Sequence, residues 1–295
     1  MHSAKGPELI SYLTEEMEGT IQDSAYSPNG EILACALDSG HLVFHDAVRN
    51  KRYSSVETPN EKSFLVDFID HNTLVHTVEK DMRVLNLEKG ECTALFAAHT
   101  SQVYSISTSL MFRNTISVAH NEAYIWDARE KNPHAKIPVQ GRPLIKYSPD
   151  GRVFMALFEE RKEMCLFDVR SYMGGPYKTK RIEIEGYSDV HFSPDGFGFA
   201  LVQKDGFRIA DGLSGDITMH LPSENSTAGC FSQDSRSFIY ATGPNEISMA
   251  TIPETKGAPI FTHSSDCPIT ALHYNPCFEQ VAVIHGQLTF LQNST

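Results

Sequence analysis

Two arginines occupy the same place in a repeated phrase, and a guanidinium there could bind an anionic group. WDAR (126–129) and FDVR (167–170) both read aromatic-Asp-x-Arg. A planar guanidinium at the mouth of a loop can form two parallel hydrogen bonds with a carboxylate or a phosphate. The competing interpretation is that each arginine braces its own inter-strand turn. Arg129 and Arg170 are therefore candidate partner-binding residues.

The second phrase leads into a Gly-Gly-Pro-Tyr segment that lengthens the connection after it. An exposed tyrosine in such a loop can anchor a partner, because large aromatic side chains dominate binding energy at interfaces. A tyrosine packed into its own turn is the alternative. We take Gly175, Pro176 and Tyr177 as further candidate binding residues.

No pattern in the sequence indicates catalysis or a metal centre. The chain has no G-x-S-x-G, P-loop, H-E-x-x-H or Cys/His zinc spacing. His41 and His45 would share one face of a strand about 13 Å apart, at a rise of ~3.3 Å per residue, which is too far for one metal. His71 and His76 are spaced in a similar way. We therefore expect a protein that is not an enzyme and needs no cofactor or metal.

These residues belong to a chain that repeats a strand-turn-strand phrase. YSPDG (147–151) and FSPDG (192–196) have the residue order of a type I turn, and an apolar run follows each. Related marks recur at intervals of 38 to 45 residues, at Tyr26, Phe68, Ile106, Tyr147, Phe192, Phe231 and Tyr274. A period of about 40–45 residues with short strands is typical of propeller blades.

The repeats predict an all-β fold, a single seven-bladed β-propeller over residues 1–295. The last repeat is one strand short. We expect residues 8–13 to supply its outer strand, which would close the ring and remove an open sheet edge. The approximate repeats are 20–60, 61–99, 100–140, 141–184, 185–224, 225–265 and 266–295.

Composition narrows the class of protein. The formal net charge is −12, which argues against a broad DNA- or RNA-binding surface. Six scattered cysteines without a C-x-x-C pair indicate reduced, mostly buried thiols in a cytosolic or nuclear protein. No apolar run approaches eighteen residues and the start lacks a secretory pattern, so we expect neither membrane contact nor export.

Four stretches of the sequence, given at the end of this paragraph, are similar to a known family. In these stretches the chain resembles the Swd-two/WD-repeat-eighty-two family of nuclear scaffold proteins, which are propellers with degenerate WD repeats. The match is weaker in the second repeat and over 222–256. The resemblance implies that His99, a nearby hydroxyl and Trp126 form a structural hydrogen-bond network, and that Asp127 of the WD dipeptide is also structural. The stretches are YIWDAR (124–129), FDVRSYMGGPY (167–177), IADGLSGDITMHL (209–221) and CPITALHYNPCFEQVAVIHGQLTFL (267–291).

The same resemblance implies a non-catalytic nuclear subunit whose partners are proteins. It suggests a SET-type histone lysine methyltransferase subunit in a COMPASS complex, a nuclear targeting subunit of protein phosphatase one, or the RNA polymerase II tail with termination and three-prime-end processing factors. The W-D-x-R phrase also resembles the motif by which substrate receptors dock onto cullin-RING ubiquitin ligases. An enzyme with its site at the channel mouth is a third alternative.

Overall fold

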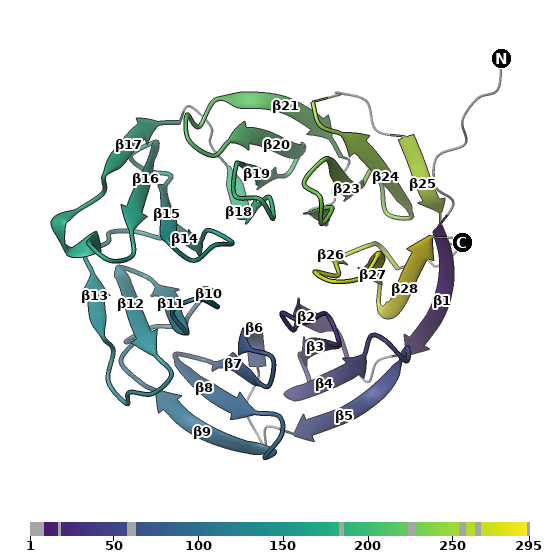
Figure 1. Ribbon diagram of the computed structural model, residues 1–295, viewed down its shortest axis with the longest axis horizontal. Helices are drawn as coiled ribbons and strands as arrows, with labels where there is room; N and C mark the ends of the chain where they lie inside the picture. Colours follow the sequence, from purple (N-terminus) through teal and green to yellow (C-terminus); the bar gives the residue numbers. More distant parts are fainter. Residues whose placement is uncertain are drawn as a thin grey trace. The chain divides into compact units, whose positions relative to one another are not determined.

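The computed structural model describes residues 9–16, 19–57, 63–182, 186–223, 228–253, 258–262 and 267–293. Within these ranges, 28 strands form seven four-stranded antiparallel sheets, so the predicted seven-bladed β-propeller fold is confirmed (Figure 1). The chain divides into two compact units, which we call the first unit (residues 18–185) and the second unit (residues 186–295 with residues 1–17).

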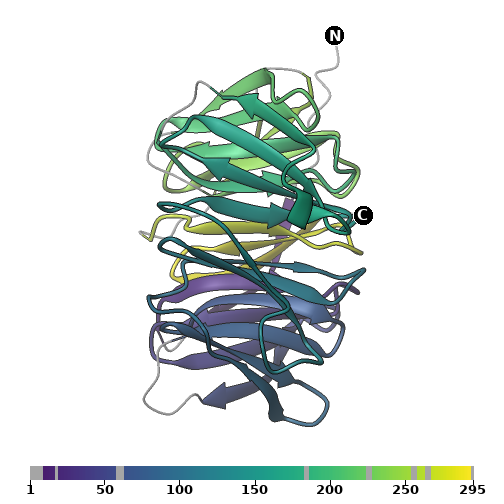
Figure 2. The same ribbon diagram turned by 90° about the vertical axis from the view of Figure 1, so that its left-hand side faces the viewer.

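The first unit contains four sheets, and the first strands of neighbouring sheets contact one another. In Figure 2 the strands of these purple, blue and teal sheets run across the view. The sheets comprise β2 (Ile21–Tyr26), β3 (Ile32–Leu37), β4 (His41–Asp46) and β5 (Lys51–Glu57); β6 (Ser63–Asp70), β7 (Thr73–Val78), β8 (Asp81–Asn86) and β9 (Glu91–Phe96); β10 (Ser105–Ser109), β11 (Asn114–Ala119), β12 (Glu122–Asp127) and β13 (Ala135–Ile137); and β14 (Leu144–Tyr147), β15 (Val153–Phe158), β16 (Glu163–Asp168) and β17 (Lys178–Arg181), with the 3-10 helix η1 (Tyr172–Gly174) before β17.

The second unit contains the other three sheets, and the last of them combines both ends of the sequence. They comprise β18 (Tyr187–Phe192), β19 (Gly198–Gln203), β20 (Gly206–Asp211) and β21 (Ile217–Pro222); β22 (Gly229–Phe231), β23 (Ser237–Ala241), β24 (Glu246–Thr251) and β25 (Ala258–Thr262); and β26 (Ala271–Tyr274), β27 (Gln280–Ile284), β28 (Gln287–Asn293) and β1 (Leu9–Glu16).

The N-terminal strand completes the last sheet, as predicted. β1 pairs antiparallel with β28 from Leu9 opposite Asn293 to Glu16 opposite Gln287, with a bulge between Ser11 and Leu13. The strand runs three residues beyond the predicted end, because its pairing continues along the whole of β28; Glu8 lies outside the described residues. The pairing gives β28 a partner on the edge that would otherwise be open.

The repeated turn phrase is held by its own side chains. The N–H of Gly151 donates to the carbonyl of Ser148 at 2.8 Å, and Ser148 Oγ donates to Asp150 Oδ1 at 2.6 Å. Val153 N–H in turn donates to Ser148 Oγ at 3.1 Å. Corresponding bonds form around Ser27, Ser193 and Ser232. The short-range pattern in the sequence therefore specifies the turn locally.

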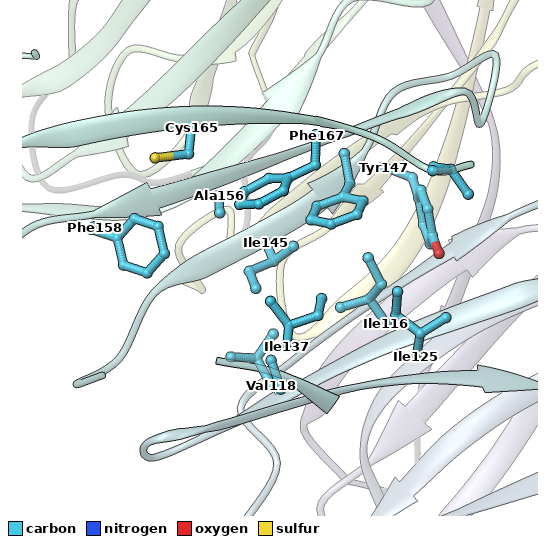
Figure 3. Packing of buried hydrophobic residues seen from close by; sticks show 13 residues of the cluster. Ile116, Val118, Ile125, Ile137, Ile145, Tyr147, Ala156, Phe158, Cys165 and Phe167 are labelled. Carbon is cyan, nitrogen blue, oxygen red and sulfur yellow. The ribbon is translucent and has the colours of Figure 1, made fainter. Parts of the chain in front are cut away.

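The apolar core lies between neighbouring sheets within each unit. In the cluster of Figure 3, Ile116, Val118 and Ile125 from the third sheet face Ile145 and other apolar residues of the fourth. Phe154 and Phe167 stack there with ring centroids 4.7 Å apart. Similar clusters join the other neighbouring sheets inside each unit. Burial between sheets is the main force that positions their turns.

Two further expectations concern the cysteines and the membrane. None of the six cysteines is in a disulfide, but the expectation that most are buried is wrong, because only Cys35 and Cys165 are buried and Cys230 is partly buried. Among the described residues there is no helix with the length and apolar character needed to cross a bilayer.

Candidate protein-interaction surface

Exposed apolar side chains gather at one end of the sheets. In an antiparallel sheet built in sequence order, the connection between the first and second strands and that between the third and fourth lie at the same end. We call the surface formed by these connections within one unit its turn face. Of the eleven large apolar side chains exposed among the described residues, eight lie on a turn face: Val48, Leu110, Met111, Met173, Tyr177, Phe197, Leu213 and Phe278. The other three lie on outer strands, at Tyr53, Leu95 and Ile217.

Bonds between neighbouring turns join parts of each turn face. In the first unit Arg113 pairs with Asp70 of the preceding sheet. In the second unit Ser235 Oγ accepts from the N–H of Asp195 at 3.0 Å, and Gln233 Nε2 donates to the carbonyl of Pro276 at 2.7 Å. Scattered single apolar residues are normal on a protein surface, whereas their concentration on one face indicates a binding surface.

Both candidate arginines lie on the turn face of the first unit, each bound to an aspartate two residues earlier. Arg129 Nε donates to Asp127 Oδ1 at 2.8 Å, and Nη2 lies 2.5 Å from Oδ2. Arg170 Nε and Nη2 bind Asp168 at 3.2 and 2.9 Å. Both guanidinium side chains are 75% exposed. The hydrogen bonds from the arginines lower the pKa of Asp127 and hold that of Asp168 at about 2.

This geometry allows both interpretations of the arginines. Each guanidinium contacts its own turn, as a brace would. A guanidinium has five N–H donors, and the aspartate uses two of them, so donors remain to point outward at an anionic partner group.

The loop after Arg170 brings the remaining candidate residues together. The chain forms η1 and passes through Gly175, whose φ of 94° places it in the left-handed region that suits glycine. Tyr177 donates its N–H to the carbonyl of Leu166 at 3.0 Å, and its side chain is 56% exposed. Partial burial raises the pKa of the Tyr177 hydroxyl, and the carboxylates of Asp168 and Asp150 add to the effect. Arg170, Gly175, exposed Pro176 and Tyr177 therefore form one local surface.

Arg129 instead borders a cavity of about 640 Å³ between the outer strand β9 and the segment after β12. Its lining includes three cationic residues, Arg83, Arg129 and Lys131, against one carboxylate, Glu130, and the exposed side chain of Leu95. Sequence reasoning missed Arg83, Leu95 and Lys131, because they come from two sheets and share no motif. The cavity can accommodate an anionic chain with an apolar contact.

Trp126 of the WD dipeptide lies in a buried network with His99, whereas Asp127 binds Arg129. Trp126 Nε1 donates to Ser117 Oγ at 2.7 Å, and Ser117 Oγ lies 2.6 Å from His99 Nε2. His99 Nδ1 lies 3.4 Å from Glu122 Oε2, and a carboxylate oxygen only accepts, so this contact favours the His99 proton on Nδ1 and leaves Nε2 to accept from the serine hydroxyl. Burial lowers the pKa of His99. The sequence had pointed to a hydroxyl without identifying Ser117, and it had missed Glu122.

Partly buried carboxylates on the first strands join neighbouring sheets. Asp23 Oδ2 accepts from Val66 N–H at 2.9 Å, and Asp67 Oδ2 accepts from the N–H and the hydroxyl of Thr108 at 2.9 Å each. Burial raises the pKa of Asp23 to about 7, against the lowering effect of these donors and of Lys146. Both carboxylates bind their neighbours in the fold, which gives them a structural use.

The histidine pairs considered in the sequence, His41 with His45 and His71 with His76, do not belong to any group of metal-ligating side chains among the described residues. His45 and His76 are buried, whereas His41 Nδ1 lies 3.0 Å from Ser39 Oγ and His71 is exposed. Within the described ranges no group of three or more His, Cys, Asp or Glu residues could hold a metal ion.

Comparison with known proteins shows similarity to WD-repeat proteins. No protein-family model matches the chain. The chain is 24% identical to WD repeat-containing protein 82 of Drosophila melanogaster over 299 residues, covering 95% of this chain and 93% of that protein. It is 26% identical to the COMPASS component SWD2 of Saccharomyces cerevisiae over 65% of this chain and 61% of that protein. A WD repeat-containing protein of Schizosaccharomyces pombe is 25% identical over 72% of this chain and 68% of its own length.

Three observations indicate the same fold: the seven sheets, the spacing of the repeats, and the similarity to a WD-repeat protein along nearly the whole sequence. The chain is a seven-bladed β-propeller whose sequence is similar to those of WD-repeat proteins.

Proposed function

We propose that this protein is a non-catalytic nuclear scaffold that binds segments of partner proteins in chromatin and transcription-regulating complexes. The observation that carries the proposal is the similarity to WD repeat-containing protein 82 over 95% of the chain. The similarity to a protein named as a COMPASS component supports a histone lysine methyltransferase complex as one setting. A nuclear complex of protein phosphatase one, and transcription termination with RNA three-prime-end processing, are the other settings we propose.

The turn face of the first unit is the proposed contact surface. It carries Arg129, Arg170 and Tyr177 together with exposed apolar residues. Guanidinium groups beside exposed aromatic and aliphatic side chains are the composition found at protein interfaces. An acidic or phosphorylated segment of a partner would complement them.

The turns themselves do not require the arginines. An aspartate Oδ1 accepts from the N–H two residues later at Arg129 and Arg170, but also at Val48 and Leu213, at 2.8 to 3.1 Å in all four loops. The same backbone turn therefore forms with an aliphatic residue at this position. We expect Arg170→Glu to weaken partner capture and to change the melting temperature little.

The experiment is affinity purification of the tagged full-length protein from its native cells with quantitative mass spectrometry. Arg49→Glu is the matched control, since Arg49 is 71% exposed and pairs with Asp46 in a different sheet of the same unit. Loss of methyltransferase, phosphatase or termination subunits from Arg170→Glu alone supports the site. If Arg170→Glu unfolds, or both variants capture partners like the wild type, the site is wrong. Recovery of a cullin and its adaptor would replace the scaffold role with that of a ubiquitin ligase substrate receptor.

A further inference from the structure

We propose that the turn face of the second unit carries a separate docking surface for a partner segment that combines basic residues with an aromatic or aliphatic side chain. Its centre is formed by Phe197 and Leu213, which we call the apolar pair. Phe197 is 74% exposed and Leu213 is 60% exposed.

The backbone brings the apolar pair side by side. Phe197 lies in the connection from β18 to β19, and Leu213 lies in that from β20 to β21. The N–H of Gly212 donates to the carbonyl of Phe197 at 2.7 Å. A Cβ at position 212 would lie 3.0 Å from the carbonyl oxygens of Gly196 and Phe197, so only glycine lets the two turns approach this closely without displacement.

Neither apolar side chain is needed to form its turn. Asp195 Oδ1 accepts from the N–H of Phe197 at 2.9 Å, and the matching bond in other sheets reaches Arg152 and Arg236, each at 3.1 Å. The same turn is therefore built with a charged residue at this position elsewhere in the chain. The exposure of a phenylalanine side chain to water is unfavourable, and the side chain does not stabilise the turn. This combination indicates that the side chain serves in binding.

The surroundings of the apolar pair are acidic. The described residues of the connections on this face include four carboxylates and one arginine, and Asp211 at the end of β20 adds a fifth carboxylate, which gives an excess of four negative charges: Asp195, Asp211, Asp216, Asp234 and Glu279 against Arg236. Hydrogen bonds from backbone and serine groups lower the pKa of Asp211 and Asp234, so these carboxylates are ionised at neutral pH. The exposed side chain of Phe278 adds apolar surface to the same face.

Charge complementarity therefore selects the occupant. A segment with lysine or arginine flanking an apolar anchor would place its cations against the carboxylates and its anchor on the apolar pair. By contrast, Val48 occupies the position of Leu213 in the first sheet, but its neighbours are Arg49 and Lys51. The proposal rests on the proposed scaffold role, but it uses residues different from Arg129 and Arg170.

The test is a selection of peptides from a random 12-residue display library on the full-length protein. The targets are the wild type, the double variant Phe197→Ser/Leu213→Ser, and Val48→Ser as a control with a similarly exposed residue in the matching loop. We expect sequences with lysine or arginine beside an aromatic or leucine to be enriched on the wild type and the control only. A synthetic peptide of that sequence should bind the double variant at least about tenfold more weakly, as for loss of a binding hot spot.

A second measurement avoids dependence on the variants' folding. Hydrogen exchange of the wild type with the same peptide should slow at residues 193–198 and 211–216. Enrichment of acidic or uncharged sequences, enrichment that survives in a folded double variant, protection elsewhere, or no enrichment at all would overturn the proposal. Because Arg129 and Arg170 remain in every variant, the scaffold proposal can fail or hold independently of this result.

Discussion

The buried network around Trp126 allows a quantitative test of how the third sheet is stabilised. Ser117→Ala removes the hydroxyl that accepts from Trp126 Nε1 at 2.7 Å and contacts His99 Nε2 at 2.6 Å. Ser117 is fully buried, and alanine keeps its Cβ, so the substitution removes hydrogen bonds with little change of volume.

The expected loss follows from the groups left behind. The Trp126 N–H and the His99 Nε2 would each remain buried without this partner, since their residues are 0% and 4% exposed. Leaving a buried polar group unpaired costs about 1–3 kcal/mol, so the two together predict a loss of ~2–6 kcal/mol in the free energy of unfolding. At about 2–4 °C per kcal/mol for a large domain, the melting temperature should fall by roughly 4–24 °C.

Ser105→Ala is the matched control. Ser105 is 5% exposed, lies on β10 beside Ser117's strand, and its hydroxyl has no hydrogen-bond partner among the described residues. Removing an unpaired buried hydroxyl should leave stability unchanged or slightly raise it.

Urea unfolding followed by circular dichroism, with thermal melts on the same samples, measures both variants. The reasoning fails if Ser117→Ala loses less than about 0.5 kcal/mol, which is below the net worth of even one hydrogen bond. It also fails if the two alanine variants unfold at the same urea concentration, because the hydrogen-bonded hydroxyl of Ser117 would then contribute no more to stability than the unpaired hydroxyl of Ser105.

Two further predictions concern stability. Gly151→Ala should destabilise more than Gly90→Ala: both glycines have positive φ, at about 69° and 66°, but only at 151 would the new Cβ lie 2.3 Å from Ser109 Oγ, whereas at 90 nothing lies within 4 Å. The left-handed backbone costs ~1–2 kcal/mol at both positions, overpacking adds about 1–3 kcal/mol at one, and equal urea midpoints would contradict the difference. The second prediction follows from the pKa of Asp23, raised from 3.8 to about 7 by burial. Between those values the folded state holds a proton on Asp23 that the unfolded state has released, so the contribution of Asp23 to the free energy of unfolding should fall as pH rises from about 4 to about 7, by at most ~4 kcal/mol at ~1.4 kcal/mol per pKa unit. Burial lowers the pKa of His45 and His76 to about 4, which makes stability rise over part of the same window, so the contribution of Asp23 is the difference between the wild type and Asp23→Asn. In urea titrations the stability of the wild type relative to Asp23→Asn should fall across the window; a difference that stays flat or rises would mean that the backbone donors and Lys146 outweigh burial.

The fold was predictable because its signals are local. The Ser-x-Asp turns and the Ser27-x-Asn29 turn close through bonds within six residues, as between Ser148 and Val153, so each of these four sheets carries a short local pattern in the sequence. The missing strand of the last repeat pointed to the N-terminal segment by the same logic of sheet edges.

The candidate sites were less predictable because their members meet across sheets or loops. Glu122 approaches His99 across 23 positions of sequence, and the cavity beside Arg129 draws Arg83 and Leu95 from a neighbouring sheet. A single backbone hydrogen bond at Gly212 brings the turns of Phe197 and Leu213 together. The repeat pattern of the sequence gives no sign of this bond. Motif reading identified the arginines, but only coordinates show each guanidinium on its own aspartate.

The two recurrent turns separate the requirements of folding from those of binding. In both, an aspartate side chain satisfies the N–H two residues later, and the turn forms whether the residue at that position is charged or apolar. The residues at this position include Arg129 and Arg170 in the first unit and Phe197 and Leu213 in the second. Because the sheets gain their stability from apolar packing between neighbours, a change at these positions alters what the surface presents without altering the core beneath it. One scaffold can thus offer a guanidinium-bearing surface on one unit and an acidic, aromatic surface on the other, and the two can recognise segments of opposite charge.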